Sequence, residues 1–338
     1  MATDEGTTRA AILKALADIG VAAGAARISA RLRATGLELR PRTVRFHLLQ
    51  MDRDGLTQLV SRRRGRLLTD RGRQELERAN VLDRVGFLAA RADALGYRMG
   101  FQCRAGEGTV VASTALLRRR DLSRALAEIG AVFAGRLGMG DRIAMVDRGG
   151  ALGGRTAPPG HVILATVCSG TVDGILMGEG IPVTSRFGGL LEMREGKPER
   201  FVELMEYSGT TVDPLEIFIA AGLTSVRRCA ETGCGAVGAS FREIPSTAVD
   251  DVRRIHQHMG GCGLSGILAI GAPNQPLLHI PVAEGRTGVI VMGGLNPFAA
   301  LREAGIQASL QSLAALEDYR SFAAFDALYR RYMDTLRQ

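Results

Sequence analysis

The part of this chain that most constrains its fold is a basic helical stretch near the start, residues 40–54, which ends at Gly55. Pro41 costs no hydrogen bond in the first turn of a helix, and glycine commonly stops one. Three apolar residues recur at helical spacing and form the predicted inward face: Val44, Leu48 and Met51. The N-terminal end of a recognition helix meets base edges and phosphates in the major groove of DNA. We therefore expect DNA contacts from the outward residues Arg40, Arg42, Thr43, Arg45 and Phe46.

An arginine-rich loop follows this helix. It lies between two short segments that can pair as strands, residues 56–60 and 66–69, and such a hairpin is the wing of a winged helix. Most charge runs are simply solvated surface. Because this run comes directly after a recognition-like helix, DNA contact is the favoured interpretation, and it involves Arg62, Arg63, Arg64 and Arg66.

Positive charge is concentrated at the start of the chain. Residues 1–84 hold 17 Arg and Lys against 10 Asp and Glu, so they carry +7 of the net charge of +8. This asymmetry indicates a basic module that binds a polyanion, joined to a larger domain that does not. Helical patterns at 7–19 and 24–35 precede the recognition stretch with helix-turn-helix spacing, and another at 70–80 follows the wing. We predict a winged helix-turn-helix DNA-binding domain at 1–84 and an effector-sensing and oligomerisation domain at 85–338.

The second domain contains repeated helix patterns. Three segments begin with a helix-capping residue and end nine positions later at a glycine that an aliphatic residue follows: 171–180, 213–222 and 296–305. The last two are the more alike, because proline follows the capping residue in both. Residues 122–137 and 249–259 are predicted as corresponding amphipathic helices.

Two Ile-Pro segments, 181–187 and 241–246, form a further repeated pattern. A strand pattern follows each of them, at 189–193 and 266–270. The repeats together predict an α/β regulatory domain with internal duplication. Such a domain is expected to be pseudo-symmetric, with a binding site at the seam between its halves.

A helical tail is predicted for residues 310–336. Its apolar residues recur at helical spacing: Leu313, Leu316, Tyr319, Phe322, Phe325, Leu328 and Tyr329. Such a helix can support dimerisation or can pack on its own domain, and the pattern leaves both interpretations open.

The candidate effector site lies where strands run through glycine into capped helices. Such turns aim backbone N–H groups and the positive end of a helix at one spot, which suits carboxylates or phosphates. Any α/β protein needs glycine and caps at these turns, so an architectural role is the competing interpretation. Arg186 and Arg242, near the Ile-Pro segments, are candidate bidentate partners for a carboxylate or members of structural ion pairs. The predicted effector-binding residues are Ser169, Thr171, Arg186, Ser208, Thr210, Arg242 and Asn296.

Catalytic and metal chemistry have little support in the sequence. The chain contains no P-loop, HExxH, GxSxG or clean dinucleotide-binding motif, so we predict neither an enzyme nor a bound cofactor. The five cysteines have no framework spacing and are expected to be free thiols. Cys229, Cys234 and Cys262 lie near three histidines, but the irregular spacing does not favour a metal site. The chain shows no secretory signal or membrane-spanning pattern, which predicts a cytoplasmic location.

A series of ordered motifs between about residues 8 and 310 resembles the NrpR nitrogen-regulatory repressor family. They are RTVRFHL at 42–48, RFGGL at 186–190, DPLEIF at 213–218, FREIP at 241–245 and GGLNP at 293–297, with shorter matches at 79–87, 165–169, 181–183 and 222–226. The resemblance implies a winged-helix repressor of nitrogen-assimilation or nitrogen-fixation genes. It also implies a palindromic double-stranded operator as partner, action as an oligomer such as a homodimer, and 2-oxoglutarate as the inducer that releases DNA.

Two other functions remain compatible with the residues. One is a winged-helix regulator that senses a different small metabolite. The other is an enzyme fused to a DNA-binding domain, which the missing catalytic motifs disfavour. A ligand screen separates the first from a 2-oxoglutarate sensor, and turnover of the bound ligand would reveal the second.

Overall fold

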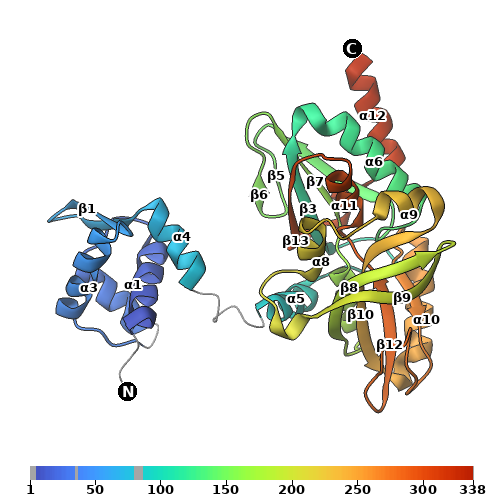
Figure 1. Cartoon of the computed structure of the whole chain (residues 1–338), viewed down its shortest axis with the longest axis horizontal. Coiled ribbons are helices and arrows are strands. Elements are labelled where there is room, and N and C mark those ends of the chain that lie inside the picture. Colours follow the sequence, from blue (N-terminus) through green and yellow to red (C-terminus); the bar gives the residue numbers. More distant parts are fainter. Residues whose placement is uncertain (1–4, 35–36, 80–86, 338) are drawn as a thin grey trace. The chain divides into compact units, whose positions relative to one another are not determined.

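The computed structural model describes residues 5–34, 37–79 and 87–337, and the chain divides into two compact units, Met1–Val85 and Gly86–Gln338 (Figure 1). This division falls next to the boundary expected after residue 84. Residues 80–84 themselves, and most of the motif at 79–87, lie outside the described residues.

The first unit is a winged helix. Its elements are α1 Glu5–Ile19, α2 Ala25–Ala34, α3 Pro41–Arg53, β1 Thr57–Ser61, β2 Gly65–Leu68 and α4 Asp70–Ala79. Strands β1 and β2 pair antiparallel as the wing. The predicted inward residues of α3, Val44, Leu48 and Met51, are fully buried and pack with Ile12 and Ile28. The helix-turn-helix and the wing are therefore confirmed at nearly the predicted boundaries.

Gly65 fixes the base of the wing. A Cβ at this position would lie 2.2 Å from the backbone carbonyl of Ala23, and its φ is +92°. Backbone hydrogen bonds join Ala23 and Arg66 in both directions at 3.0 Å. Only glycine permits this close approach between the wing and the segment that leads into α2.

The second unit contains two copies of one strand-and-helix plan. The first copy consists of β3 Thr109–Arg118, α6 Leu122–Ala134, β4 Arg142–Asp147, β7 His161–Val167, α7 Gly170–Gly178 and β8 Thr184–Arg194. The second consists of β10 Gly235–Pro245, α10 Val249–Gly261, β11 Ile267–Ile270, β12 Arg286–Met292, α11 Asn296–Glu303 and β13 Ala308–Asp318. The predicted correspondence of the helices at 122–137 and 249–259 is that of α6 and α10. The internal duplication is thus confirmed.

The remaining elements of the second unit lie around this duplicated body. They are α5 Phe87–Arg98, β5 Ala151–Leu152, β6 Arg155–Thr156, β9 Lys197–Glu206, α8 Pro214–Ala220, α9 Val226–Thr232, β14 Ala323–Ala324 and α12 Phe325–Arg337. Short 3-10 turns lie at Arg119–Asp121, Tyr207–Gly209, Ser246–Ala248 and Tyr319–Ser321.

The two copies exchange their last strands. One five-stranded sheet has the order β13-β3-β7-β4-β14, and the other has the order β11-β12-β10-β8-β9. Strand β13 of the second copy therefore pairs with β3 of the first, and β8 of the first pairs with β10 of the second. Neither copy can complete its sheet alone, so the two copies form one domain.

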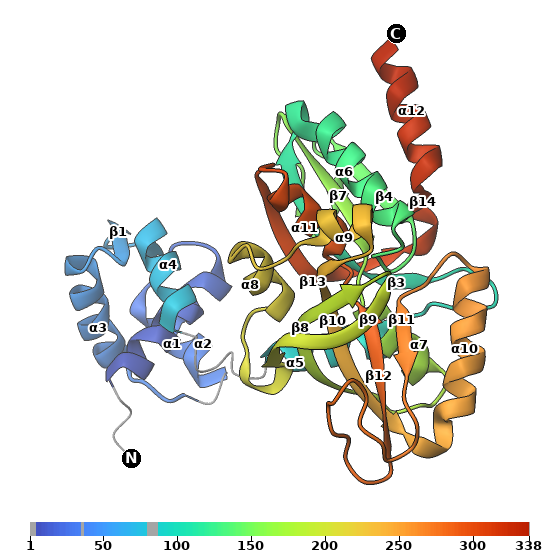
Figure 2. The same cartoon turned by 45° about the vertical axis from the view of Figure 1, so that its right-hand side comes forward.

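Helices cover both faces of the two sheets. Along β7, Val162 and Leu164 belong to a core that includes α6, α8, α9 and α11, whereas Ile163 and Ala165 belong to a core that includes α7 and α10. Figure 2 shows α10 beside β11 and β12, and α6 near α11. Because successive side chains of a strand point to opposite faces, alternate residues pack into two separate hydrophobic cores.

Two predictions about the repeats were wrong. The Ile-Pro segments 181–187 and 241–246 are not equivalent, because the first enters β8 and the second ends β10, and these strands pair antiparallel with Phe187 opposite Phe241. The topology also equates α7 with α11, whereas α8, with its similar Asp-Pro start, lies outside the repeat. The two Ile-Pro segments, and the starts of α8 and α11, are therefore alike because of local capping and strand entry. They do not hold equivalent positions in the repeat.

The predicted helix at 310–336 is a strand over its first part. Residues Ala308–Asp318 form β13, whose register with β3 breaks between Gln311 and Ala315. This break removes the strict alternation that marks a strand in the sequence. Only Phe325–Arg337 is helical, as α12, and there Phe325 packs edge-on against Phe133 of α6 with ring centroids 5.4 Å apart. The start of α12 thus packs on its own domain.

Candidate functional site

The outward N-terminal face of α3 is the candidate DNA interface. Arg40 is its N-cap, with extended backbone, and Pro41 occupies the first turn as predicted. The outward side chains are exposed, and Phe46 is 57% exposed although it is a large aromatic residue. The exposed set comprises Arg40, Arg42, Thr43, Arg45 and Phe46. Burial of Val44, Leu48 and Met51 fixes the rotation of the helix and so the direction of these side chains.

The wing tip presents three further arginines. Arg62, Arg63 and Arg64 are exposed in the turn between β1 and β2, where the Arg64 N–H donates to Ser61 Oγ at 3.0 Å. No ion pair neutralises these three side chains within the described residues. They are therefore free to approach a polyanion.

Arg66 differs from the other wing arginines. Its Nε donates to Asp52 Oδ2 at 2.7 Å, and its side chain is only 12% exposed. Asp52 also accepts a hydrogen bond from Thr57 Oγ1 at 2.6 Å. In the structure Arg66 joins the end of α3 to the base of the wing, which is the structural alternative to the DNA contact predicted for it.

The seam of the second unit holds a buried ion pair between the two copies. Arg242 of β10 donates to both carboxylate oxygens of Asp173 of α7, and its Nη2 also donates to the Ser169 carbonyl oxygen at 3.1 Å. Ser240 Oγ accepts from Nη1 of the same guanidinium, and Ser185 Oγ donates to Asp173 Oδ2 at 3.0 Å. Ser169 and Arg242 are thus brought together as expected, but Arg242 already has a carboxylate partner.

Arg186 lies on the other face of the same sheet. Arg242 pairs with Ser185, and Phe241 pairs with Phe187, so Arg186 is the extra residue of a β-bulge. Its Nη1 donates to Glu243 Oε1 at 2.6 Å and to the Pro281 carbonyl oxygen at 3.1 Å. The two arginines therefore do not converge on one ligand.

Thr171 and Asn296 hold equivalent positions in the two copies. Thr171 Oγ1 accepts from the Val111 N–H at 3.1 Å and donates to the Val111 carbonyl oxygen at 3.2 Å. Asn296 accepts from the Gly238 N–H at 2.8 Å and donates to the Gly238 carbonyl oxygen at 2.9 Å. Each side chain therefore ties the start of a helix to the neighbouring strand, which is the architectural alternative to effector binding.

Ser208 and Thr210 lie in an exposed loop. Ser208 Oγ donates to Glu206, and Thr210 Oγ1 donates to the Val212 carbonyl oxygen at 2.6 Å. Neither side chain shares a contact with Ser169 or Arg242 in the described structure. The predicted effector residues therefore divide among a buried seam, the opposite sheet face and this loop.

The seam also contains ionisable residues that the sequence patterns did not predict as a group. Burial raises the pKa of Asp213, whose Oδ1 caps α8 through the Leu215 N–H at 2.8 Å. Burial also raises the pKa of Glu216 to about 7, and its Oε1 accepts from the Ser312 N–H. The pKa of the buried Tyr207 hydroxyl lies well above its usual value, first through burial and then through Asp213. Ser312 of β13 contacts both Asp213 and Glu216 and so joins this group to the second copy.

A winged-helix unit joined to a duplicated α/β domain is the architecture of a DNA-binding regulator with a separate regulatory domain. A family model described as NrpR regulatory domains NRD1 and 2 matches residues 85–324, and one described as Ribonuclease R winged-helix domain matches residues 10–76. The chain is 33% identical over 298 residues to the global nitrogen regulator NrpRI of Methanosarcina mazei, an alignment that covers 88% of this chain and 91% of that relative. The chain belongs to the NrpR family.

Two further relatives are longer. The global nitrogen regulator NrpR of Methanococcus maripaludis is 28% identical, with 92% of this chain and 54% of the relative covered. The global nitrogen regulator NrpR of Methanocaldococcus jannaschii is 31% identical, with 83% of this chain and 48% of the relative covered. The chain thus spans about half the length of these two proteins.

A solved structure resembles most of this chain. The crystal structure of a nitrogen repressor-like protein from Methanococcus jannaschii has a TM-score of 0.59 and 25% sequence identity to this chain, and the match covers 70% of this chain and 97% of that one. Among the described helices of the present chain, none is long and apolar enough to cross a membrane.

Proposed function

We propose that this protein is a repressor of nitrogen-assimilation or nitrogen-fixation genes that binds double-stranded operator DNA and is released by 2-oxoglutarate. The observation that carries the DNA-binding part is the exposed basic face of α3, with Arg42, Thr43, Arg45 and Phe46 turned outward by the buried face of the same helix. The names of its relatives as global nitrogen regulators support the choice of target genes.

The proposed mode of DNA binding follows from the winged helix. Helix α3 enters a major groove with its N-terminal residues at the base edges, while the wing arginines Arg62, Arg63 and Arg64 contact phosphates. A homodimer places two such helices on the half-sites of a palindrome, about one helical turn apart. The specificity then comes from α3, and much of the affinity comes from the phosphate contacts.

We propose the seam of the second unit as the effector site. A carboxylate of 2-oxoglutarate competes with Asp173 for Arg242 beside Ser169, at the start of α7, where the helix dipole favours an anion. Because Arg242 joins one copy to the other, exchange of its partner alters how the two copies pack. A 100-fold loss of operator affinity requires only about 2.7 kcal/mol of differential binding, which two or three charge-assisted hydrogen bonds can supply.

The test is operator binding measured by fluorescence anisotropy at fixed salt, because phosphate contacts make affinity steeply salt-dependent. DNA from upstream of the chain's own gene and of neighbouring nitrogen genes is titrated with protein, with and without millimolar 2-oxoglutarate, and succinate serves as the control dicarboxylate. We expect specific binding that 2-oxoglutarate weakens and succinate does not. Specific binding that 2-oxoglutarate leaves unchanged would instead indicate a repressor that senses another metabolite.

A further inference from the structure

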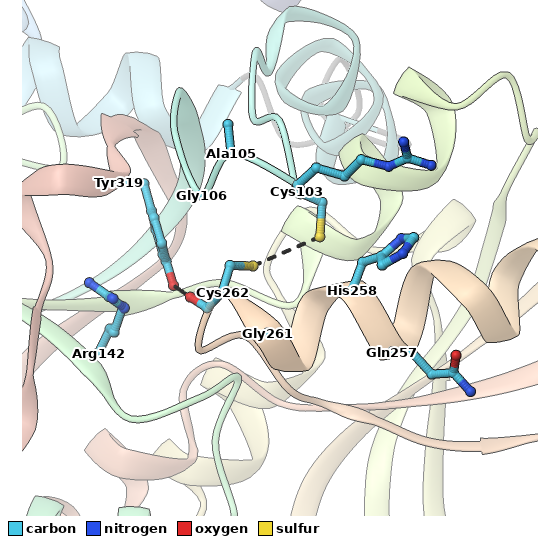
Figure 3. A pocket seen from close by; sticks show the side chains of 10 residues that line it. Cys103, Ala105, Gly106, Arg142, Gln257, His258, Gly261, Cys262 and Tyr319 are labelled. Atoms are coloured by element: carbon cyan, nitrogen blue, oxygen red, sulfur yellow. Dashed lines mark hydrogen bonds between the residues drawn. The ribbon is translucent and has the colours of Figure 1, made fainter.

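Cys103 and Cys262 face each other across the boundary between the two copies of the second unit (Figure 3). Their Sγ atoms are 3.8 Å apart, although 159 positions separate them in the chain. Cys103 lies in the turn before β3 of the first copy, and Cys262 directly follows α10 of the second. The fold therefore brings two free thiols from different copies into contact.

Both cysteines are held in place by their own local structure. The turn that carries Cys103 is closed by a hydrogen bond from the Gln102 N–H to the Glu107 carbonyl oxygen at 2.8 Å. Cys262 donates its thiol proton to the Met259 carbonyl oxygen, with Sγ and O 3.2 Å apart, and its own carbonyl oxygen accepts from the Tyr319 hydroxyl at 2.7 Å. The contact between the thiols is thus a fixed feature of the fold.

The two thiols line a pocket of about 510 Å³. Arg104, Arg142 and His258 also line it, and no Asp or Glu does so within the described residues. Figure 3 shows both sulfur atoms between the side chains of Arg142 and His258. A small polar oxidant can therefore reach the pair without unfolding of the domain.

The other three cysteines differ from this pair. Cys168 and Cys229 are buried, and Cys234 is half-buried with its Sγ accepting from the Glu195 N–H at 3.5 Å. Burial, and then the neighbouring Cys234, raise the pKa of the Cys229 thiol. In the described part of the chain, however, only Cys103 and Cys262 are joined by a hydrogen-bond contact between their sulfur atoms.

We propose that Cys103 and Cys262 are a modification site at which a hydroperoxide forms a reversible disulfide between the two copies. Hydrogen peroxide first oxidises the Cys262 thiol to a sulfenic acid, and the O–O bond breaks with release of one water. The Cys103 thiol then attacks that sulfur, the S–O bond breaks, and a second water leaves with the Cys103 proton. Two thiols are oxidised by two electrons, and one peroxide is reduced to two waters.

The order of these steps follows from the environment of Cys103. Burial and the neighbouring Cys262 raise the pKa of the Cys103 thiol to about 12, so Cys103 is a poor initial nucleophile. Oxidation of Cys262 removes only the contribution of the neighbouring thiol, and burial still holds the pKa of Cys103 above its usual value. Attack by Cys103 on the adjacent sulfenic acid is therefore the slower of the two steps. The sulfur atoms must approach from 3.8 Å to a bond length of about 2.05 Å.

The disulfide would tie the segment between α5 and β3 to the end of α10. Helix α5 is the first described element after the winged-helix unit. The disulfide would therefore link the start of the second unit to the second copy of the repeated fold. It closes a loop of more than one hundred residues, which restricts the unfolded chain and raises the melting temperature.

The experiment counts thiols in the full-length chain before and after treatment with hydrogen peroxide, in denaturant with a thiol reagent. We expect five thiols in the reduced protein and three after oxidation. A reductant should restore all five. Trypsin digestion without reductant should then give a linked pair of peptides, residues 99–104 and 255–286, whose mass falls by two hydrogens relative to the sum of the reduced peptides.

Variants separate this pair from non-specific oxidation. Cys262→Ser should keep all four of its thiols under the same treatment, whereas the matched control Cys234→Ser should fall from four to two. Melting of each reduced variant by calorimetry checks that it is folded. The proposal is overturned if wild type keeps five thiols, if the linked peptides contain other cysteines, or if the product is an intermolecular dimer.

Discussion

Asp173 and Arg242 form a buried ion pair in which each partner comes from a different copy of the duplicated fold. Their side chains are 11% and 3% exposed. Ser185 and Ser240 complete the hydrogen bonding, so neither charge is left unsatisfied at the atoms that meet. The ion pair is therefore a direct, fully hydrogen-bonded link between the two copies.

Removal of one partner of this pair should strongly destabilise the second unit. Asp173→Asn leaves the Arg242 guanidinium buried without a counter-charge, and the expected loss in free energy of unfolding is about 3–5 kcal/mol. Urea denaturation followed by circular dichroism measures it. The double variant Asp173→Leu with Arg242→Met should recover most of the loss, because a buried pair replaced by apolar residues is often neutral. Equal losses in the single and double variants would contradict this account.

The wing arginines should separate into a structural and a DNA-contacting class. Arg66→Ala removes the partner of Asp52, so the free energy of unfolding of the winged helix should fall by about 1–3 kcal/mol. Arg63→Ala, at the exposed wing tip, should change stability by less than about 0.5 kcal/mol. It should nevertheless weaken operator binding across sequences and reduce the salt slope by about 1. Calorimetry and anisotropy on the two variants make the distinction, and similar behaviour of both would contradict it.

The stability of the second unit should depend on pH through Glu216. Burial raises the pKa of its carboxyl from 4.5 to about 7, so the folded state holds the proton more tightly than the unfolded chain. The contribution is fully present below about pH 4.5 and is lost as the pH rises through about 7, by up to about 3 kcal/mol. Burial acts in the same direction on the pKa of Asp213 and Asp93.

Glu216→Gln tests this contribution. The variant keeps an acceptor for the Ser312 N–H but cannot ionise, so the decline in unfolding free energy between pH 5 and pH 8 should become shallower than in wild type. Glu284→Gln, at an exposed position, serves as the matched control and should leave the decline unchanged. Parallel profiles for wild type and Glu216→Gln would show that Glu216 does not titrate in this range.

The winged helix could be predicted because its signals are local. Pro41, the spacing of Val44, Leu48 and Met51, and Gly55 fix one helix and its inward face without reference to distant residues. The exchange of β8 and β13 could not be predicted in this way. An alternating pattern shows that a strand has two faces but does not identify its neighbour, and the break in β13 near Gln311 also hides the alternation.

The candidate effector residues show the same limit. The aligned segments 171–180 and 296–305 predict that Thr171 and Asn296 are equivalent, and both make the same pair of hydrogen bonds in their copies. The pattern does not show that these bonds tie each helix to a neighbouring strand. Arg186 and Arg242 both lie in the repeated Ile-Pro segments of the sequence. The bulge at Arg186 nevertheless places the two side chains on opposite faces of the sheet. Glu216 joins the seam through a contact with Ser312, 96 positions away.

Operator binding by Arg45→Ala, measured over a range of salt concentrations, tests whether the basic face of α3 binds DNA. Arg253→Ala, which removes the same charge from an exposed site on α10, is the control. If Arg45 reads a base, Arg45→Ala should weaken binding at a single salt concentration by about 5- to 150-fold. If it contacts phosphate, a series of salt concentrations should show the salt slope lowered by about 1. Arg253→Ala should match wild type. Wild-type affinity and salt slope in Arg45→Ala would contradict the assignment of α3 as the recognition helix.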